Sequence, residues 1–338
     1  MTTPLFTVLL PVVRTPELLP YAVESVLAQT EPRFELIVIG DGAPPETIAC
    51  AEEFARRDAR VSVRPFPKGE RHGEAHRHAV LGSARGSLVA QSADDDLWFP
   101  DYLRELAALL AEVDFGNLLT SLLKPDGTVV TLPGDLADPR WRQAMVDRRW
   151  TSFGPSTAGY RIEAYRALPV GWSPAPTDMP TDVHMWRKFL SAPGLRVGTR
   201  FAVESIGLPT PPRVGHSLAE RSAEAAAVSR RIATEEGRRA LREAAVHGLQ
   251  REQADSFWAR EDLMAAYEHT RGAYEHTRGA YEHTRGAYGR ARAEVERSAS
   301  VAAAALAEVE RLRSSRSWAL TAPLRGAAGL VRARLGRD

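Results

Sequence analysis

Three consecutive aspartates, Asp94, Asp95 and Asp96, are the residues whose type and spacing most directly indicate chemistry. They follow a strand-like run at residues 86–90 and precede a helix-like run at residues 102–110. Adjacent carboxylates repel one another, so they stay ionised together only when a cation or solvent shares their charge. A divalent cation held by carboxylate oxygens would supply that charge. The alternative is an acidic helix start, because aspartate also favours the N-cap and first turn of a helix.

The elements that must position the triplet are alternating strands and helices. A continuous apolar run, typical of a strand buried on both faces, occupies residues 5–13, and further strand-like runs occupy residues 34–39, 61–65 and 86–90. Apolar residues at helical spacing lie between them, in residues 17–29, 45–57 and 73–84. This alternation predicts an α/β fold with a mostly parallel sheet flanked by helices. Ligands of such sheets bind beyond the carboxyl ends of the strands, where the triplet is expected.

Composition narrows the classes of protein that the chain could belong to. Its 338 residues carry a net charge of +1, which gives no bulk electrostatic reason to expect a nucleic-acid partner. The single cysteine, Cys50, excludes an internal disulfide and fits a reducing compartment. We expect no secretory signal and no membrane span, because neither a basic-then-apolar leader nor a run of about eighteen apolar residues occurs. These features predict a cytoplasmic protein.

The chain is expected to divide into three segments. Prolines at residues 209–212 indicate the end of a globular domain at residues 1–215. Residues 216–313 are rich in Ala, Glu and Arg, the composition of a long helix. Within this segment, residues 266–286 hold three copies of Ala-Tyr-Glu-His-Thr-Arg-Gly, a period of seven. Residues 314–338 form a basic amphipathic tail.

The seven-residue period is typical of a coiled coil, through which the chain would form a homo-oligomer. The alternative is a recent duplication inside a solvated helix. With Tyr267 at heptad position a, the frame continues past the repeat to Val309 at position a and Leu312 at position d. The seam is weak, because threonine and alanine bury little surface and each copy contains a glycine. The repeated histidines lie seven residues apart and so do not converge on one metal ion.

The tail contains Trp318 and several leucines among arginines. This pattern is typical of a helix that lies on an anionic membrane surface. It predicts peripheral association with the inner face of the membrane. The alternatives are a solvated helix end and a segment that docks to a protein partner.

Several stretches, in a fixed order, resemble family 2 glycosyltransferases of the GT-A fold. They are residues 7–11, 17–30, 34–42, 71–74, 84–86, 94–103 and 181–186. The resemblance spans residues 5–210 and leaves residues 216–338 outside it. It implies transfer of a sugar from a nucleotide-sugar donor to a hydroxyl acceptor, with inversion at the anomeric carbon. The product would belong to a cell-surface polysaccharide or glycoconjugate.

The resemblance also implies a metal site and a catalytic base. Asp96 and Asp94 would bind a divalent cation, Mg²⁺ or Mn²⁺, with Asp96 the direct ligand. Such a cation stabilises the charge that accumulates on a nucleoside diphosphate as it leaves. Asp182 resembles the general base that removes the proton of the acceptor hydroxyl. A helix N-cap is the alternative role for Asp182.

The donor would be a UDP-, dTDP- or GDP-sugar and the acceptor a glycan or a lipid-linked saccharide. By the same resemblance, the nucleotide-sugar contacts fall on Pro11, Val13, Asp41, Arg71, Asp94 and Asp95.

Two other functions remain open from the sequence. A nucleotidyltransferase also combines an α/β sheet with acidic metal ligands, but its phosphate loop is rich in glycine and residues 11–15 contain none. A non-catalytic scaffold is the second alternative. It would retain the sugar-nucleotide fold and join partners through the helical segment, since fold alone does not fix function. Residues 12–14 and Gly40 depart from the family pattern and favour this reading.

Overall fold

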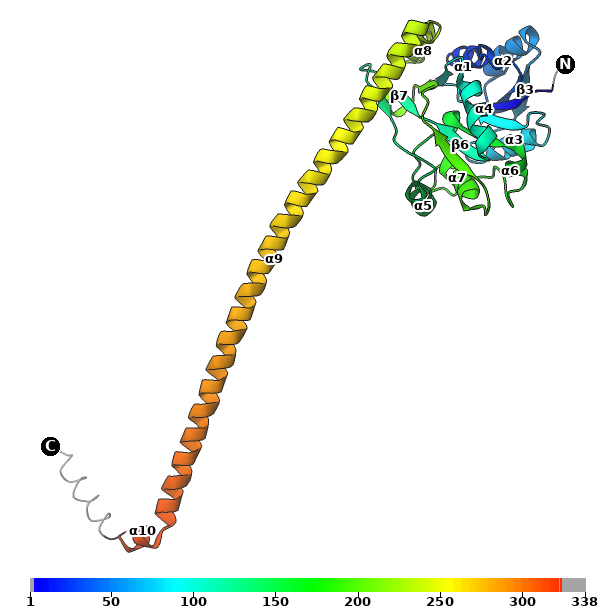
Figure 1. The fold of residues 1–338 in the computed structure, drawn as a ribbon. Coiled ribbons are helices and arrows are strands. Elements are labelled where there is room, and N and C mark those ends of the chain that lie inside the picture. Colours follow the sequence, from blue (N-terminus) through cyan, green and yellow to red (C-terminus); the bar gives the residue numbers. More distant parts are fainter. Residues whose placement is uncertain (1–2, 322, 324–338) are drawn as a thin grey trace. The chain divides into compact units, whose positions relative to one another are not determined.

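A seven-stranded sheet organises the first part of the chain (Figure 1). The computed structural model describes residues 3–321 and residue 323. In spatial order the strands are β10 (Val197–Arg200), β6 (Phe115–Leu118), β9 (Ala158–Arg161), β4 (Leu88–Gln91), β1 (Phe6–Val12), β2 (Phe34–Asp41) and β3 (Val61–Phe66). Neighbouring strands run parallel, except that β9 is antiparallel to both β4 and β6. The predicted α/β fold with a mostly parallel sheet is confirmed.

Both faces of this sheet are buried, because alternate residues of a strand point to opposite faces. Val8 and Leu10 of β1 pack on one face, whereas Leu9 packs on the other. The first face is covered by α1 (Leu19–Leu27), α2 (Pro45–Arg57) and α4 (Tyr102–Glu112). The second is covered by α3 (Glu74–Leu81), α5 (Pro139–Asp147), α6 (Ile162–Arg166) and α7 (Thr181–Ser191). The strands are therefore apolar at consecutive positions.

A smaller sheet lies beside the acidic triplet. Its strands, in order, are β5 (Asp96–Trp98), β11 (Ser205–Gly207), β7 (Ser121–Leu123) and β8 (Val129–Thr131). A third apolar cluster joins this sheet to α8 (Leu218–Ile232) and to the first turns of α9 (Glu235–Ser314). The two short 3₁₀ helices near the sheet are η1 (Pro155–Thr157) and η2 (Pro211–Arg213).

The first compact unit of the chain ends at Ser256, so the boundary expected at residue 215 lies inside it. The physical reason is that α8 and the start of α9 bury apolar side chains, among them Val228 and Leu241, against the small sheet. A capping box between Ser217 and Glu220 begins α8. At Gly248 the backbone of α9 approaches β8 so closely that a Cβ would stand 2.2 Å from a carbonyl oxygen.

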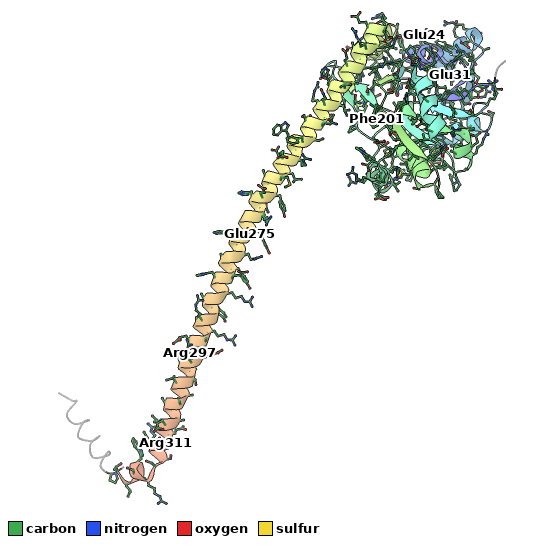
Figure 2. All side chains as sticks on the ribbon, in the orientation of Figure 1. Glu24, Glu31, Phe201, Glu275, Arg297 and Arg311 are labelled. Atoms are coloured by element: carbon green, nitrogen blue, oxygen red, sulfur yellow. The ribbon has the colours of Figure 1, made fainter. Side chains whose placement is uncertain are left out.

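The second unit begins at Phe257 and consists mainly of the rest of α9, an 80-residue helix in all. The predicted long C-terminal helix is confirmed. Its side chains, such as Glu275 and Arg297, project from the helix and are exposed (Figure 2). The short helix α10 (Arg316–Leu320) follows.

The prediction for the basic tail falls mostly on residues 322 and 324–338, which lie outside the described residues. In the part of the chain that is described, no helix combines the length and apolar character needed to cross a membrane.

Candidate active site

Two neighbouring cavities lie beyond the carboxyl ends of β1, β2 and β4. The first, about 230 Å³ in volume, is lined by five residues predicted for the site: Pro11, Val13, Asp41, Arg71 and Asp94. The second, about 330 Å³ in volume, is lined by Asp95 and Asp96. Ala93 and Pro155 line both cavities. The acidic triplet therefore stands on the boundary between the two.

The first cavity is rich in cationic side chains. Arg14, Lys68, Arg71, His72 and Arg77 all contribute to its lining. Arg77 is buried, its guanidinium lies over the ring of Trp172, and it donates a hydrogen bond to the carbonyl of His72. Among the described residues, its Nε has no hydrogen-bond acceptor. A buried guanidinium with a free donor favours an anionic ligand such as a phosphate.

Asp41 fixes the segment at Lys68 and Gly69, which borders this cavity. One carboxylate oxygen accepts a hydrogen bond from Lys68 Nζ at 2.7 Å, and the other accepts one from the Gly69 amide at 2.6 Å. Burial opposes the ionisation of Asp41, but these two donors hold its pKa below the ordinary value. A Cβ on Gly73, where φ is +69°, would stand 2.7 Å from Asp41 Cγ. Gly73 is therefore needed for this close approach.

The three aspartates of the triplet have different surroundings. Asp94 is buried and pairs with Arg14 Nε at 3.0 Å. Burial raises the pKa of Asp94 to about 6, and the neighbouring Arg14 only partly offsets it. Oδ2 of Asp95 contacts Arg14 and Arg221, each at 3.3 Å. Two guanidinium groups therefore supply countercharge that the sequence had assigned to a metal ion.

Asp96 differs from its two neighbours because it forms no ion pair with any described side chain. Burial and the charge of Asp95 together raise the pKa of Asp96 above its ordinary value. Its Oδ1 lies so near Gly207 that a Cβ there would stand 2.8 Å away. Asp96 is the carboxylate of the triplet left for a cation to neutralise.

Sequence analysis missed the two arginines that pair with the triplet, Arg14 and Arg221. Arg14 follows the end of β1, so its place at the same sheet edge as the triplet was a usable signal. Arg221 belongs to α8 and lies 126 positions from Asp95 in the chain. Nothing in the sequence indicated that pairing.

Asp182 lies in the first turn of α7, away from the lining of both cavities. Its Oδ1 accepts a hydrogen bond from the Val183 amide at 2.8 Å, and burial raises the pKa of Asp182. The same turn is tied to the first cavity's border, because Thr181 donates to Glu74 at 2.6 Å. His72, which lines the cavity, favours the ionised form of Asp182. The carboxylate therefore lines neither cavity in this conformation.

The chemistry of the triplet fits a divalent cation that the protein and its substrate hold together. The described residues contain no cluster of three or more acidic, histidine or cysteine side chains arranged as a complete metal site. Mg²⁺, however, is commonly bound by one or two carboxylates together with phosphate oxygens and water. Asp96, with Asp94 beside the adjoining cavity, provides such a partial donor set.

Residues 7–165 match the sequence model of the family described as Glycosyl transferase family 2. The chain thus carries a family 2 glycosyltransferase domain. The matched segment includes both Asp41 and the triplet.

Relatives of this glycosyltransferase domain include proteins named for polysaccharide synthesis. The O-antigen biosynthesis protein RfbC of Myxococcus xanthus is 26% identical over 214 residues, 58% of this chain and 16% of RfbC. The putative glycosyltransferase EpsE of Bacillus subtilis is 26% identical over 170 residues, 50% of this chain and 60% of EpsE. The uncharacterised protein y4gI of Sinorhizobium fredii is 32% identical over 134 residues, 38% of this chain. The chain spans 14% of y4gI, and less than two thirds of each of these three relatives.

Among solved structures, S. aureus TarS 1-349 has a TM-score of 0.48 and 16% identity, with 68% of this chain and 70% of that one covered. The mannosyltransferase PcManGT from Pyrobaculum calidifontis has a TM-score of 0.45 and 21% identity, with 67% and 65% covered.

Proposed function

We propose that this chain transfers a sugar from a nucleotide-sugar donor to a hydroxyl acceptor, with inversion, during synthesis of a cell-surface polysaccharide or glycoconjugate. One observation carries the proposal. A family 2 glycosyltransferase domain gathers Pro11, Asp41, Arg71 and Asp94 around one cavity that adjoins Asp96. The names of RfbC and of the putative teichuronic acid biosynthesis glycosyltransferase TuaG of Bacillus subtilis, which is 28% identical over 127 residues, support the class of product.

In this proposal the nucleoside occupies the first cavity, between Pro11, Val13 and Asp41. Arg71 and Arg77 face its phosphates, because guanidinium groups pair well with phosphate oxygens. The donor is a UDP-, dTDP- or GDP-sugar. Asp41 already holds Lys68 and Gly69, so a contact from Asp41 to the base or ribose requires Lys68, half of whose side chain is exposed, to turn away.

Asp96 is the proposed direct ligand of a divalent cation, Mg²⁺ or Mn²⁺, and Asp94 its partner. When bound, the cation supplies charge stabilisation to the departing nucleoside diphosphate. Asp95 stays with its two arginines and contacts the donor.

Asp182 is the proposed general base. The anomeric carbon is attacked directly by the acceptor oxygen, whose proton passes to the Asp182 carboxylate. The bonding pair of the broken bond leaves with the nucleoside diphosphate. A raised pKa suits this role, because a base works best when its pKa approaches the working pH. One oxygen accepts the Val183 amide, and the other is available for the proton.

We also propose that the helical segment after Phe257 pairs with a second copy of this chain. Tyr267, Tyr274, Tyr281 and Tyr288 recur every seven residues and are exposed. A strict seven-residue repeat stays on one stripe only when helices supercoil about each other. Sedimentation of the full chain should show a dimer or higher oligomer. Tyr274→Glu with Tyr281→Glu, which places charge in the stripe, should convert it to a monomer. A wild-type chain that sediments as a monomer at micromolar concentration would refute this pairing.

We also propose that the protein is cytoplasmic and associates with the inner face of an anionic membrane. Removing residues 314–338 should lower co-sedimentation with anionic vesicles while neutral vesicles bind neither form. Equal vesicle binding by both forms would contradict it.

A non-catalytic scaffold is the second candidate function. The observation in its favour is that Arg14 already neutralises Asp94 and Asp95 at distances of 3.0 and 3.3 Å. On this view the arginine has replaced the cation, and the domain has kept its fold without turnover.

One experiment separates the two candidates. The purified full chain is given a panel of nucleotide sugars with Mn²⁺ or Mg²⁺, and released nucleoside diphosphate is measured. Asp96→Ala and Asp182→Ala should abolish release. Asp126→Ala should leave it unchanged, because Asp126 is fully exposed and caps only a turn through the Thr128 amide. Release that persists in both active-site variants would overturn the site assignment. A wild-type chain that binds no nucleotide sugar by calorimetry would favour the scaffold.

A further inference from the structure

Helix α8 reaches the acidic triplet from outside the family-matched segment. The Arg221 side chain is only 8% exposed. Its Nη2 lies 3.3 Å from Asp95 Oδ2 and donates to the Leu208 carbonyl at 3.2 Å, and its Nη1 donates to Thr210 Oγ1 at 3.2 Å. A buried guanidinium is costly unless it is paired, and the one carboxylate paired with it in the described residues is Asp95.

Arg14 approaches the same carboxylate oxygen from the side of β1. Its Nη2 lies 3.3 Å from Asp95 Oδ2, and its Nε pairs with Asp94. Oδ2 of Asp95 is thus shared by two guanidinium groups, one from the segment after β1 and one from α8. This arrangement holds Asp95 in place, whereas Asp96 forms no ion pair within the part of the chain that the structure describes.

The wall of the second cavity is held by the same helix. Pro209, Thr210 and Pro211 line that cavity. Arg213, which follows them and is fully buried, makes two hydrogen bonds of 2.6 Å to Glu224 of α8. The Leu208 amide in turn donates to the Asp95 carbonyl at 2.9 Å. Helix α8 therefore fixes both the wall and the backbone of the triplet.

We propose that Arg221 is a positioning residue that, together with Arg14, withholds the Asp95 carboxylate from the divalent cation and leaves Asp96 as the direct ligand. This inference rests on the proposed function, because it needs the cation site at Asp96. Its physical basis is charge. A guanidinium beside the triplet repels an incoming cation and competes with it for Asp95, so removing that guanidinium strengthens cation binding to the free protein.

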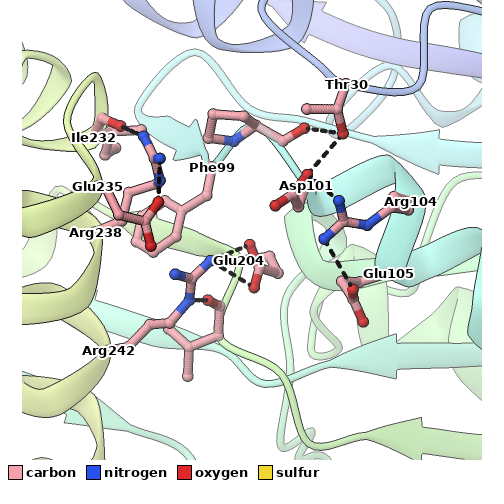
Figure 3. A network of polar contacts seen from close by, with 12 residues as sticks. Thr30, Phe99, Asp101, Arg104, Glu105, Glu204, Ile232, Glu235, Arg238 and Arg242 are labelled. Atoms are coloured by element: carbon pink, nitrogen blue, oxygen red, sulfur yellow. Dashed lines mark hydrogen bonds and ion pairs between the residues drawn. The ribbon is translucent and has the colours of Figure 1, made fainter.

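The test compares Arg221→Gln, which keeps a hydrogen-bond donor but loses the charge, with Arg221→Lys, which keeps the charge. The control is Arg242→Ala. Arg242 joins α9 to Glu204 at 2.9 and 2.8 Å, as Figure 3 shows, and lines neither cavity. The Arg242→Ala substitution therefore removes the link between α9 and Glu204 but no contact of the triplet. Mn²⁺ affinity is measured by calorimetry on the full chain without donor, and kcat and KM for the donor are measured separately.

Arg221→Gln is expected to bind Mn²⁺ about threefold to tenfold more tightly than wild type, because one positive charge beside the triplet is removed. Its kcat should nevertheless fall, because Asp95 then competes for the ion. Arg221→Lys should restore both values toward wild type, and Arg242→Ala should change neither. A merely structural role would weaken Mn²⁺ binding along with turnover.

Two failures are distinguishable. If wild type binds no Mn²⁺ and releases no nucleoside diphosphate, the proposed function fails and this inference fails with it. If wild type does both and Arg221→Gln binds Mn²⁺ no more tightly than wild type, the inference alone is overturned. Arg14→Gln gives a second reading should the Arg221 variants not fold. It should also tighten Mn²⁺ binding, and unchanged or weaker binding would again overturn the inference.

Discussion

Replacing Asp94 by asparagine should stabilise the protein and abolish its activity. The Asp94 side chain is 7% exposed, and burial raises its pKa to about 6 from the ordinary value of 3.8. Keeping this carboxylate ionised at neutral pH therefore costs folding free energy. Asparagine has nearly the same shape and carries no charge, so it removes that cost. Functional sites commonly sacrifice stability in this way.

The magnitude follows from the difference between the two pKa values. At about 1.4 kcal/mol per pKa unit, ionisation of Asp94 lowers the free energy of unfolding of the wild-type protein by about 3 kcal/mol at about pH 7.5. The reference is the protein with Asp94 protonated. Because the folded-state pKa is raised, this stability is fully present below the unfolded value near 3.8 and is lost as pH rises through about 6. The pKa of about 6 already includes the attraction of Arg14, so losing that ion pair adds no separate cost. We therefore expect Asp94→Asn to gain about 3 kcal/mol near neutral pH, or about 6–12 °C in Tm for a unit of this size.

The assay is urea unfolding of the full chain with a chelator present, at about pH 7.5 and about pH 5. The stability advantage of Asp94→Asn should shrink by about half at the lower pH, because the wild-type carboxyl is then partly protonated. Asp126→Asn, an exposed position, should show no pH-dependent difference of this kind. A variant that is less stable than wild type at both pH values, or an advantage that does not change with pH, would refute the reasoning.

Three further predictions concern the base, the wall and the helix. Asp182→Asn should lower kcat by about 10²–10⁴ while calorimetry shows unchanged donor binding, and a loss of donor affinity would contradict its role as a base. Its pKa is raised by burial, so wild-type kcat should fall as pH drops through that pKa, and a pH profile without an acid limb would argue against it. Arg213→Ala should destabilise the first unit by about 3–5 kcal/mol in urea unfolding, because Glu224 loses its buried partner. Gly272→Ala with Gly279→Ala should raise the melting temperature of the helical signal in circular dichroism, at about 1 kcal/mol per glycine, since a Cβ at either position meets nothing within 4 Å. No change, or a lower melting temperature, would mean that these glycines serve a contact the free helix lacks.

The central sheet was predictable because the pattern of apolar residues in each strand and helix can be seen within a short stretch of sequence. Residues 5–13 are apolar at every position except Thr7, and the structure buries both faces of β1 there. The helices that follow carry their own apolar spacing, so their order alone implied the mostly parallel arrangement. The triplet was found for the same reason, since three charges in succession at a strand end need no tertiary knowledge to be noticed.

The partners of the triplet could not be predicted in that way. Asp95 meets Arg14 across 81 positions and Arg221 across 126. An arginine in an Ala/Glu/Arg-rich helix has the appearance of a solvated residue, and its burial depends on how α8 packs on the small sheet. The same packing explains why the first unit continues past the boundary that the prolines at residues 209–212 predict. Val228 and Ile232 have helical spacing, but sequence alone does not say which surface covers them.

The two cavities draw on different parts of the chain, and this bears on specificity. Every residue that lines the first cavity lies between positions 11 and 155, inside the family-matched segment. The second cavity also draws on residues 205–211, which follow that segment and are held by α8. If the first cavity holds the nucleoside, residues of the family-matched segment suffice to line its binding site. Whatever enters the second cavity meets a wall set by the later residues, so sugar or acceptor preference should depend on residues 205–221. Relatives that match only the earlier segment are therefore a poor guide to that preference.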